Sequence, residues 1–344
     1  MDALAPAASL DLDREPLPLE AWYVACASAE LGDDEPIVRR IHDRPIVLFR
    51  DADGAAGALH DRCPHRGVAL SLGQVADGAV ACAYHGWRFA RDGTCVHIPS
   101  LCEGRAVAAG VAADAYPCVE TNAYVWVWTG KGPPAPAEPL AIPAFGERAW
   151  IQAAMDLACE AMLPIENNLD VSHPYFTHPN THPQWFVIKR IGFRDNVYRL
   201  ALTETGLCLT GGRDGFGGVS LAFDLPDRAT VDLGPQGPLI VMHHTPTTPG
   251  HCRQHWLFST ALAEGPQTHS LRWTQKEPEI LRQDRRVMES AQLAYQAEGA
   301  DFERSVEADA PTLLARRVIR MAAAGRWPAD KDTLKFRERL TIRS

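Results

Sequence analysis

Two short groups of cysteine and histidine have the spacing of a metal site. Cys63 and His65 form a Cys-x-His pair, and Cys82 and His85 form a Cys-x-x-His pair after sixteen intervening residues. Two thiolates and two imidazoles are the ligands of a [2Fe–2S] cluster in which two cysteines bind one iron and two histidines bind the other. A structural zinc site can use the same residue types, but it usually groups its cysteines and its histidines separately. Because each cysteine here has its own histidine, the pattern favours the cluster.

A second group of candidate ligands lies a hundred residues further along the chain. His173 and His178 follow Asp170, at the end of a helix-like segment that starts near Ala158. Two histidines and one carboxylate on one face of a metal are the ligands of non-haem Fe(II) oxygenases. Pro174 disfavours helical backbone at His173, so we expect the helix to break or distort between the two histidines. The alternative is that both are ordinary, partly buried histidines.

Asp284 is the candidate for the third ligand of this second site. It lies in a predicted helix, residues 277–297, in which apolar residues at helical spacing predict a buried face: Ile280, Val287, Ala291 and Ala294. Asp284 falls on that face, where an ionised carboxylate is costly unless it is paired or bound to a metal. The alternative is a buried ion pair with one of its arginine neighbours: Arg282, Arg285 or Arg286.

Asp170 has several possible roles. As a carboxylate near His173 it is a possible ligand, although Asp284 already completes a set of three. It is equally able to accept a hydrogen bond from the second nitrogen of His173 or from a cluster histidine, and such carboxylates fix the tautomer of a ligand. The remaining alternative is an aspartate on the surface of a helix.

The first part of the chain has the pattern of short strands joined by turns. Three apolar or aromatic runs predict strands: Trp22–Ala25, Pro45–Phe49 and Ala123–Trp128. Asp-Gly pairs at 53–54, 77–78 and 92–93 are typical of hairpin turns. We therefore predict a small all-β domain over residues 20–130.

A proline-rich segment separates this domain from a second one. Five prolines lie between Gly130 and Pro143, a density that neither a helix nor a central strand tolerates. After it, residues 144–325 combine a helix-like segment, several β-like runs and two predicted helices, over 277–297 and Thr312–Ala324. A chain of 344 residues is long enough for two domains with separate cores.

Composition excludes several classes of protein. The chain is 46 % hydrophobic and carries a net charge of −9, so we expect a globular protein that does not bind nucleic acid. Since no apolar run reaches the roughly 18 residues of a membrane span, we expect no membrane segment. The first sixteen residues lack a basic start and do not resemble a secretory signal. Seven of the nine cysteines lie outside the two pairs without regular spacing, which favours reduced thiols in the cytoplasm.

Together, the segments Cys63–His85 and Asn167–His178 resemble the catalytic subunit of a Rieske non-haem iron oxygenase. The resemblance extends from about Trp22 to about Gly299 and is closest to the branch that includes vanillate and dicamba O-demethylases. Further matching segments are Ala21–Ala25, Tyr84–Trp87, Cys95–Pro99 and Thr245–Thr247.

The resemblance implies an α+β chain with an N-terminal all-β Rieske [2Fe–2S] domain. A helix-grip (START/Bet v1-like) catalytic domain would follow, in which an antiparallel sheet wraps around a long helix. His173, His178 and Asp284 would bind the mononuclear Fe(II), and Asn167 would lie beside that iron. Asp170 would bridge to the Rieske histidine of a neighbouring subunit, which implies a head-to-tail ring, a homotrimer.

The resemblance also implies an activity. Electrons from NAD(P)H would arrive through a separate ferredoxin or flavin reductase, and O2 would be used to hydroxylate or demethylate a small aromatic, heterocyclic or natural-product substrate. Ring cis-dihydroxylation and N-oxygenation need the same iron and remain alternatives. An electron carrier with an inactive iron site is a different class, and the presence of all three iron ligands argues against it.

The resemblance does not extend to the substrate pocket. In the dicamba enzyme a histidine shortly before a Thr-Pro-like pair helps to bind the substrate carboxylate, but Met242 is the residue three before Thr245 here, and His243 and His244 follow it. A carboxylic acid substrate is therefore not predicted. Other residues are expected to be structural, as core tryptophans, turn glycines, or surface or pocket histidines: Trp185, Trp273, Gly211, Gly212, Gly217, Gly218, His251 and His255.

Overall fold

The computed structural model describes residues 17–179, 181, 194–212, 218–234, 238–259, 268–269 and 279–344. The chain divides into two compact units. We call residues 19–155 and 245–272 the N-terminal unit, and residues 1–18, 156–244 and 273–344 the C-terminal unit. The domain boundaries proposed from the sequence, 20–130 and 144–325, stay predictions. Within the described residues, no helix is long and apolar enough to cross a membrane.

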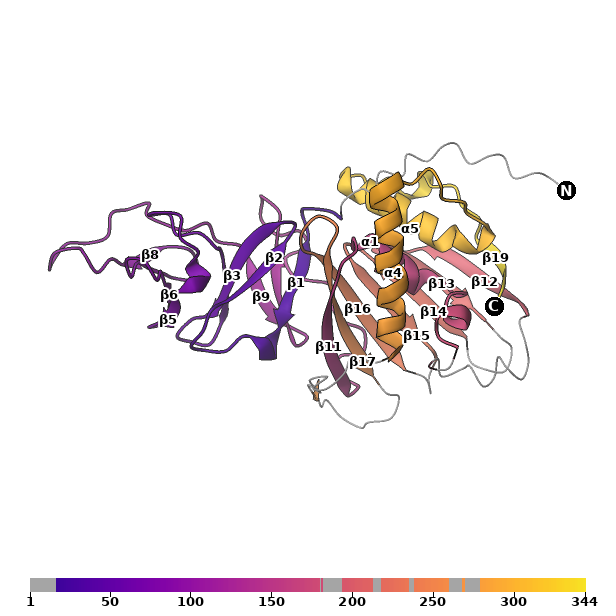
Figure 1. The fold of residues 1–344 in the computed structure, drawn as a ribbon, viewed down its shortest axis with the longest axis horizontal. Helices are drawn as coiled ribbons and strands as arrows, with labels where there is room; N and C mark the ends of the chain where they lie inside the picture. Colours follow the sequence, from indigo (N-terminus) through magenta and orange to yellow (C-terminus); the bar gives the residue numbers. More distant parts are fainter. Residues whose placement is uncertain are drawn as a thin grey trace. The chain divides into compact units, whose positions relative to one another are not determined.

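The N-terminal unit is built from short strands (Figure 1). Three small sheets have the strand orders β1-β10-β9, β2-β3-β4 and β5-β6-β7-β8. Their bounds are β1 Trp22–Ala27, β2 Ile37–Ile41, β3 Arg44–Arg50, β4 Ala56–His60, β5 Gln74–Ala76, β6 Ala79–Ala81, β7 Arg88–Phe89, β8 Cys95–His97, β9 Cys118–Thr121 and β10 Tyr124–Trp128. Three later strands follow, β11 Trp150–Leu157, β17 Cys252–Ser259 and β18 Thr268–His269. The prediction of an all-β first domain is confirmed.

The turns of this unit lie where the Asp-Gly pairs predicted them. The pairs at 53–54, 77–78 and 92–93 connect β3 to β4, β5 to β6 and β7 to β8. The proline-rich segment 130–143 contains neither a helix nor a strand. A buried core of aliphatic and aromatic side chains lies behind the second and third sheets, and both Cys63 and Cys82 belong to it. The candidate cluster thiols are therefore anchored in the hydrophobic core.

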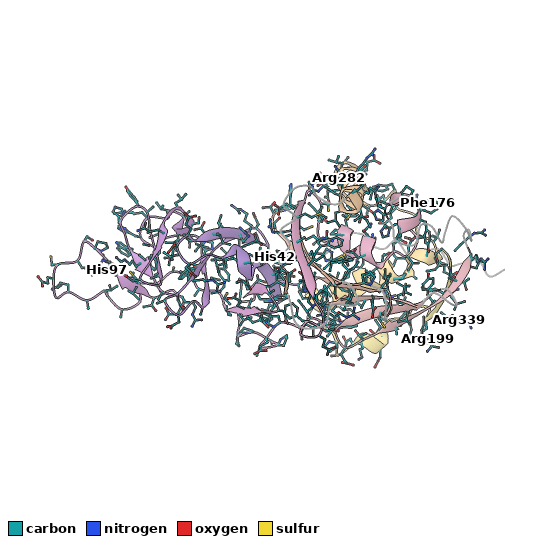
Figure 2. The ribbon with its side chains drawn as sticks, turned by 90° about the horizontal axis from the view of Figure 1, so that it is seen from below. His42, His97, Phe176, Arg199, Arg282 and Arg339 are labelled. Atoms are coloured by element: carbon teal, nitrogen blue, oxygen red, sulfur yellow. The ribbon has the colours of Figure 1, made fainter. Side chains whose placement is uncertain are left out.

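The C-terminal unit contains consecutive antiparallel strands in the order β16-β15-β14-β13-β12-β19. Their bounds are β12 Asp195–Leu202, β13 Gly206–Gly211, β14 Val219–Asp224, β15 Arg228–Asp232, β16 Leu239–Pro246 and β19 Arg339–Arg343. The last strand was not predicted from the sequence. It pairs with β12 and places Arg339 opposite Arg199 (Figure 2).

Helices accompany this sheet, with bounds α1 Met162–Leu169, α2 Pro174–Thr177, α4 Glu279–Glu298 and α5 Ala310–Ala323. Helix α1 packs against β14 and β15 and also contacts α4 and α5. The two predicted helices over 277–297 and Thr312–Ala324 thus correspond to α4 and α5 within a few residues. An antiparallel sheet with few helices confirms the predicted α+β class.

The helix that carries the candidate histidines differs from its prediction. Helix α1 begins at Met162 rather than near Ala158, and it ends at Leu169 because Asp170 takes extended backbone angles. The break therefore precedes His173 instead of separating the two histidines. His173 itself is helical, with φ −55° and ψ −36°, so the expected effect of Pro174 on its backbone was wrong. Pro174 occupies the first turn of α2, where a missing N–H costs little.

Candidate iron sites

The two Cys-His segments form matching turns in the N-terminal unit. In the first, the N–H of Gly67 donates to the Cys63 carbonyl at 2.9 Å, and the Cys63 N–H donates to the Val68 carbonyl at 2.8 Å. In the second, Gly86 donates to Cys82 at 2.9 Å, and Cys82 donates to Trp87 at 2.8 Å. In both turns, the N–H of the glycine four residues after the cysteine donates to the carbonyl of that cysteine.

Glycine is required at the end of each turn. Gly67 has φ +76° and Gly86 has φ +69°, in the left-handed region that residues with a Cβ atom rarely adopt. A side chain at either position would strain the turn and shift the neighbouring cysteine. Gly67 and Gly86 therefore help to position the two cysteines of the candidate cluster site.

The ligand side chains divide into a buried pair and an outer pair. Cys63 and Cys82 are 2 % and 3 % exposed, whereas His85 is exposed and His65 is half-buried. The two imidazole rings lie 4.6 Å apart, and the indole of Trp87 stacks on His65 at 4.4 Å. The Nδ1 atom of His65 is buried without a hydrogen-bond partner among the described residues. This free nitrogen, next to two buried thiols, fits the ligand set of a [2Fe–2S] cluster.

The two pKa shifts in this site act in opposite directions on metal binding. Burial raises the pKa of the Cys63 thiol, and the nearby Cys82 raises it further, so the unliganded thiol stays protonated. Iron would displace that proton, because the thiolate is the metal ligand. Burial and the neighbouring His85 lower the pKa of His65, which keeps its imidazole neutral as a ligand must be.

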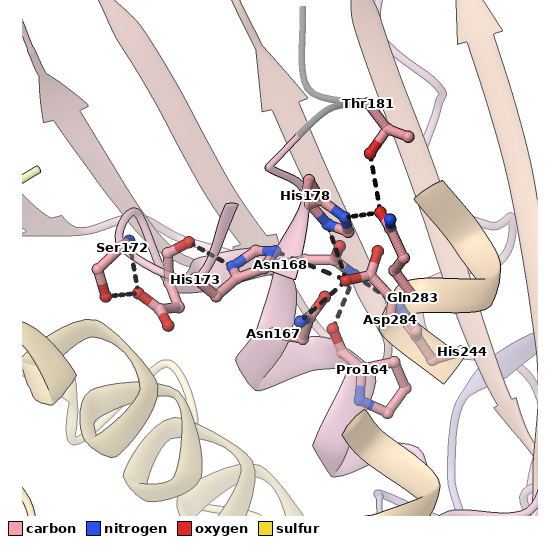
Figure 3. A network of polar contacts seen from close by, with 11 residues as sticks. Pro164, Asn167, Asn168, Ser172, His173, His178, Thr181, His244, Gln283 and Asp284 are labelled. Atoms are coloured by element: carbon pink, nitrogen blue, oxygen red, sulfur yellow. Dashed lines mark hydrogen bonds and ion pairs between the residues drawn. The ribbon is translucent and has the colours of Figure 1, made fainter. Parts of the chain in front are cut away.

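The second group of candidate ligands converges in the C-terminal unit (Figure 3). One ligand atom from each of His173, His178 and Asp284 lies within 4.8 Å of the other two. The Oδ1 atom of Asp284 is 3.0 Å from Nε2 of His178 and 3.8 Å from Nε2 of His173. Two imidazoles and one carboxylate at these distances fit a mononuclear iron.

Both histidines are held by their other ring nitrogen. Nδ1 of His173 donates to the main-chain carbonyl of Asp170 at 2.9 Å, and Nδ1 of His178 donates to the Oε1 atom of Gln283 at 2.9 Å. A carbonyl oxygen only accepts, so each Nδ1 carries a proton, and in the neutral imidazole each Nε2 keeps its lone pair. Both lone pairs are thus available on the side of Asp284.

The two histidines differ in their response to Asp284. Burial opposes a charge on both rings. In His178 the hydrogen bond and negative charge of Asp284, together with Gln283, outweigh burial and raise the pKa. In His173 burial dominates and lowers the pKa, although Asp284 and Asp170 act in the opposite direction. Asp284 lies closer to His178, and Gln283 acts on that ring alone, whereas burial outweighs the two aspartates for His173.

Asp170 does not hold His173 through its carboxylate. Its Oδ1 atom accepts hydrogen bonds from the Ser172 N–H at 2.7 Å and from the Ser172 hydroxyl at 2.6 Å. The hydrogen bond to His173 comes from the Asp170 main-chain carbonyl instead. The prediction that the carboxylate accepts from His173 was therefore wrong, and the predicted contact with a cluster histidine of another subunit stays a prediction.

Asn167 lies beside the ligand set, with its side-chain amide 3.5 Å from Oδ1 of Asp284. The next residue, Asn168, donates to the Pro164 carbonyl at 2.7 Å and lies 3.1 Å from Nε2 of His244. Nδ1 of His244 in turn donates to the main-chain carbonyl of Asp227 at 2.7 Å. The last turn of α1 is thus tied to the sheet strand β16.

The buried face of α4 differs from the one predicted. Asp284 is buried, 7 % exposed, but its buried companions are Leu281, Met288 and Gln292. Val287, predicted to be buried, is 45 % exposed. The buried face of α4 therefore differs from the predicted face, and Asp284 is the one residue that belongs to both. Arg282 projects from α4 and pairs with Glu279, not with Asp284 (Figure 2).

Sequence reasoning did not assign a role to Gln283, Asn168 or Asp227. Only their places in the sequence could have indicated two of them, because Gln283 precedes Asp284 and Asn168 follows Asn167. Among the residues expected to be structural, His251 is exposed and His255 is fully buried. Trp185, Gly217 and Trp273 lie outside the described residues.

Comparison with known domain families supports this arrangement. Residues 21–113 match the Rieske [2Fe-2S] domain, and residues 217–325 match the vanillate O-demethylase oxygenase C-terminal domain. The chain therefore combines a Rieske domain with an oxygenase C-terminal domain. The matched Rieske segment contains all four cluster ligand candidates, and the C-terminal match contains Asp284.

Individual relatives are similar over part of their length. Chlorophyllide a oxygenase of Chlamydomonas reinhardtii is 36 % identical over 68 % of this chain and 34 % of that protein. The dicamba O-demethylase oxygenase component of Stenotrophomonas maltophilia is 38 % identical over 46 % of this chain and 47 % of that protein. The matches thus span from about a third to about half of these relatives.

The fold is that of a solved Rieske oxygenase. The crystal structure of dicamba monooxygenase bound to dicamba covers 90 % of this chain and 98 % of its own, with a TM-score of 0.68 at 22 % identity. The predicted order of domains, an all-β Rieske domain before a catalytic domain with an antiparallel sheet, agrees with this likeness.

Proposed function

We propose that the chain is the catalytic subunit of an oxygenase that hydroxylates or oxidatively demethylates a small aromatic, heterocyclic or natural-product molecule. The reaction uses O2 and electrons that start on NAD(P)H. One observation carries the proposal: one chain holds both a set of two cysteines and two histidines for a cluster and a set of two histidines and one carboxylate for a single iron. A cluster alone only transfers electrons. The set of His173, His178 and Asp284 is therefore the feature that favours an oxygenase over an electron carrier.

The residues of the second site have distinct tasks. When bound, the iron supplies the redox chemistry that O2 activation needs. His173 and His178 offer two neutral nitrogens, and Asp284 contributes the one negative charge. These three residues would hold the iron and would leave room beside it for O2 and substrate. The burial of His178 and Asp284 keeps bulk water away from the ligands.

His244 does not serve as an anchor for a substrate carboxylate in this proposal. It is 0 % exposed, and its two ring nitrogens are engaged by Asp227 and Asn168. A bound acid would have to displace one of these contacts. The proposed substrate therefore stays a small aromatic, heterocyclic or natural-product molecule that is not bound through a carboxylate at His244.

The proposal includes partners and a compartment. Electrons arrive through a ferredoxin or flavin reductase, and the assembly is a homotrimer in which the cluster of one subunit serves the iron of the next. The compartment we propose is the cytoplasm, where the seven cysteines outside the cluster site would stay reduced. None of the described cysteines is in a disulfide.

Replacement of the three ligands tests the proposed function. His173→Ala, His178→Ala and Asp284→Ala should each abolish NADH- and O2-dependent product formation with a surrogate reductase. The visible spectrum of the cluster should persist, and iron should fall from about three to about two atoms per chain. An Asp284→Ala protein with near-normal turnover and iron content would require a different third ligand.

A further inference from the structure

Gln283 stands next to Asp284 on α4 and contacts the ring nitrogen of His178 that does not face the metal site (Figure 3). Its Oε1 atom is 2.9 Å from Nδ1 of His178 and 2.8 Å from the Thr181 hydroxyl. The Oε1 atom of Gln283 thus accepts two hydrogen bonds, one from His178 and one from Thr181. Asp284, the neighbouring residue, approaches the opposite nitrogen of the same imidazole at 3.0 Å.

The orientation of this amide and the tautomer of His178 depend on each other. With Oε1 facing the ring, the proton is on Nδ1 and the lone pair of Nε2 is free for a metal. With the amide NH2 facing the ring, Nδ1 would have to accept, and Nε2 would carry the proton and lose its capacity as a ligand. In the first orientation the Thr181 hydroxyl also donates to Oε1, at 2.8 Å.

An uncharged acceptor has a further consequence. Histidine ligands usually donate to a carboxylate, a main-chain carbonyl or water. Here His173 uses the main-chain carbonyl of Asp170, and His178 uses the side-chain carbonyl of Gln283. Asp284 therefore supplies the only carboxylate in direct contact with either imidazole among the described residues. Both histidines are held as ligands without adding negative charge to the site.

We propose that Gln283 is a positioning residue of the mononuclear site, which selects the metal-binding tautomer of His178 through its amide oxygen. One turn of α4 then supplies both a ligand, Asp284, and the group that prepares another ligand. The proposal rests on the proposed function only in assuming that the two histidines and the carboxylate bind a divalent metal.

Metal affinity tests this role without relying on turnover. Protein that keeps its cluster is stripped of mononuclear iron with a chelator and titrated with Co(II), whose absorption reports the ligand environment. Gln283→Met keeps the volume but removes the acceptor, and it should weaken Co(II) binding roughly 10- to 100-fold. Gln283→Glu restores an acceptor oxygen and should bind Co(II) within about threefold of the wild-type protein or more tightly.

Two controls separate the possible explanations. Thr181→Val removes the other donor and leaves the bond to His178, so Co(II) affinity should change by less than about threefold. Asp284→Ala should lose Co(II) binding outright. Wild-type affinity in Gln283→Met, or equal losses in Gln283→Met and Gln283→Glu, would overturn the role of Gln283. Unchanged affinity in Asp284→Ala would instead refute the metal site itself, and with it the proposed function.

Discussion

The histidines of the two sites present different ring nitrogens. Nδ1 of His65 is buried without a hydrogen-bond partner in the described part of the chain, whereas His173 and His178 use Nδ1 for hydrogen bonds and present Nε2. Local structure explains the contrast. The cluster histidines sit on tight turns beside their cysteines, and the other two flank a short helix whose neighbours offer carbonyl oxygens. In the second site the main-chain carbonyl of Asp170 and the side-chain amide of Gln283 thus favour one ring nitrogen before any metal binds.

The first prediction at this scale concerns the cluster ligands. Cys63→Ser and Cys82→Ser should each remove the visible absorption and the EPR signal of the reduced cluster. His85→Cys should keep a cluster but lower its reduction potential by roughly 100 mV or more, because a charged thiolate replaces a neutral imidazole. Redox titration followed by EPR measures both effects. Survival of the wild-type signal in either serine variant would rule out the assignment.

The second residue-scale prediction concerns His244. Burial lowers its pKa to about 4, and nearby His243 acts in the same direction, although Asp227 opposes both. In the unfolded chain a histidine titrates near pH 6.5. Between pH 6.5 and 4 the unfolded state therefore binds more protons, and stability is lost as the pH falls. The loss should reach about 2 kcal/mol at pH 5.

The measurement is urea unfolding at pH 7.5 and pH 5. A His244→Gln variant should lose less stability between the two pH values than the wild-type protein, by about the same 2 kcal/mol. His251→Gln, which replaces an exposed histidine, is the matched control. If the free energy of unfolding depended on pH identically in the wild-type and His244→Gln proteins, the lowered pKa of His244 would be contradicted.

At the scale of elements, the sequence predicted what local patterns encode. The strands around Trp22–Ala25 and Pro45–Phe49 were found because each is a run of apolar or aromatic residues, and an Asp-Gly pair follows the second run. Strand β19 was missed because it gains its partner, β12, from more than a hundred residues away. Pairing partners at such a distance leave no local pattern in a single sequence.

In the candidate iron site, too, some residues could be predicted from the sequence and others could not. The two histidines and Asp284 were identified from residue type, and the structure brings them together. The face of α4 was misjudged because alanines satisfied the helical pattern as well as larger residues do, while Leu281 and Met288 make the actual contact with the core. Gln283 escaped notice because a polar side chain beside a ligand has no signature before its partner is known.

The third prediction concerns the attachment of α1 to its neighbours. Arg316 of α5 donates to Glu166 of α1 and to Glu303, the latter through two bonds of 2.9 Å. Its side chain is 13 % exposed, and burial is outweighed by the two carboxylates, which raise its pKa. Arg316→Met would leave both carboxylates buried without their cation. The free energy of unfolding should fall by about 3 kcal/mol.

Arg282→Met provides the comparison. This arginine pairs with Glu279 on the same helix, and both side chains are about half exposed. Exposed pairs contribute little, so the expected loss is about 0.5 kcal/mol. Chemical denaturation of the two variants measures the difference. Equal losses would show that the Arg316 contacts do not hold α1 in place.

At the scale of the whole molecule, the fourth prediction concerns assembly. The proposed homotrimer passes electrons from the cluster of one subunit to the iron of the next, with Asp170 between them. Asp170→Asn keeps the size of the side chain and removes its charge. Both metal sites should stay loaded, and oxidation of the reduced cluster in a single turnover should slow by roughly tenfold or more.

Stopped-flow absorbance follows that oxidation, and light scattering gives the mass of the assembly. Ser172→Ala is a useful companion, because it removes one of the two hydrogen bonds to the Asp170 carboxylate and leaves the charge in place. A stable and fully active monomer, or an Asp170→Asn protein that turns over at the wild-type rate, would refute the arrangement.

The spacing of the ligands along the chain also determines when each site becomes available during synthesis. The four cluster ligands all lie between Cys63 and His85, so the ribosome delivers them together and early. His173 and His178 follow, but Asp284 and Gln283 are more than a hundred residues later. At usual translation rates this interval lasts roughly 5–20 s. A nascent chain thus carries the complete ligand set for the cluster well before it carries the one for the single iron.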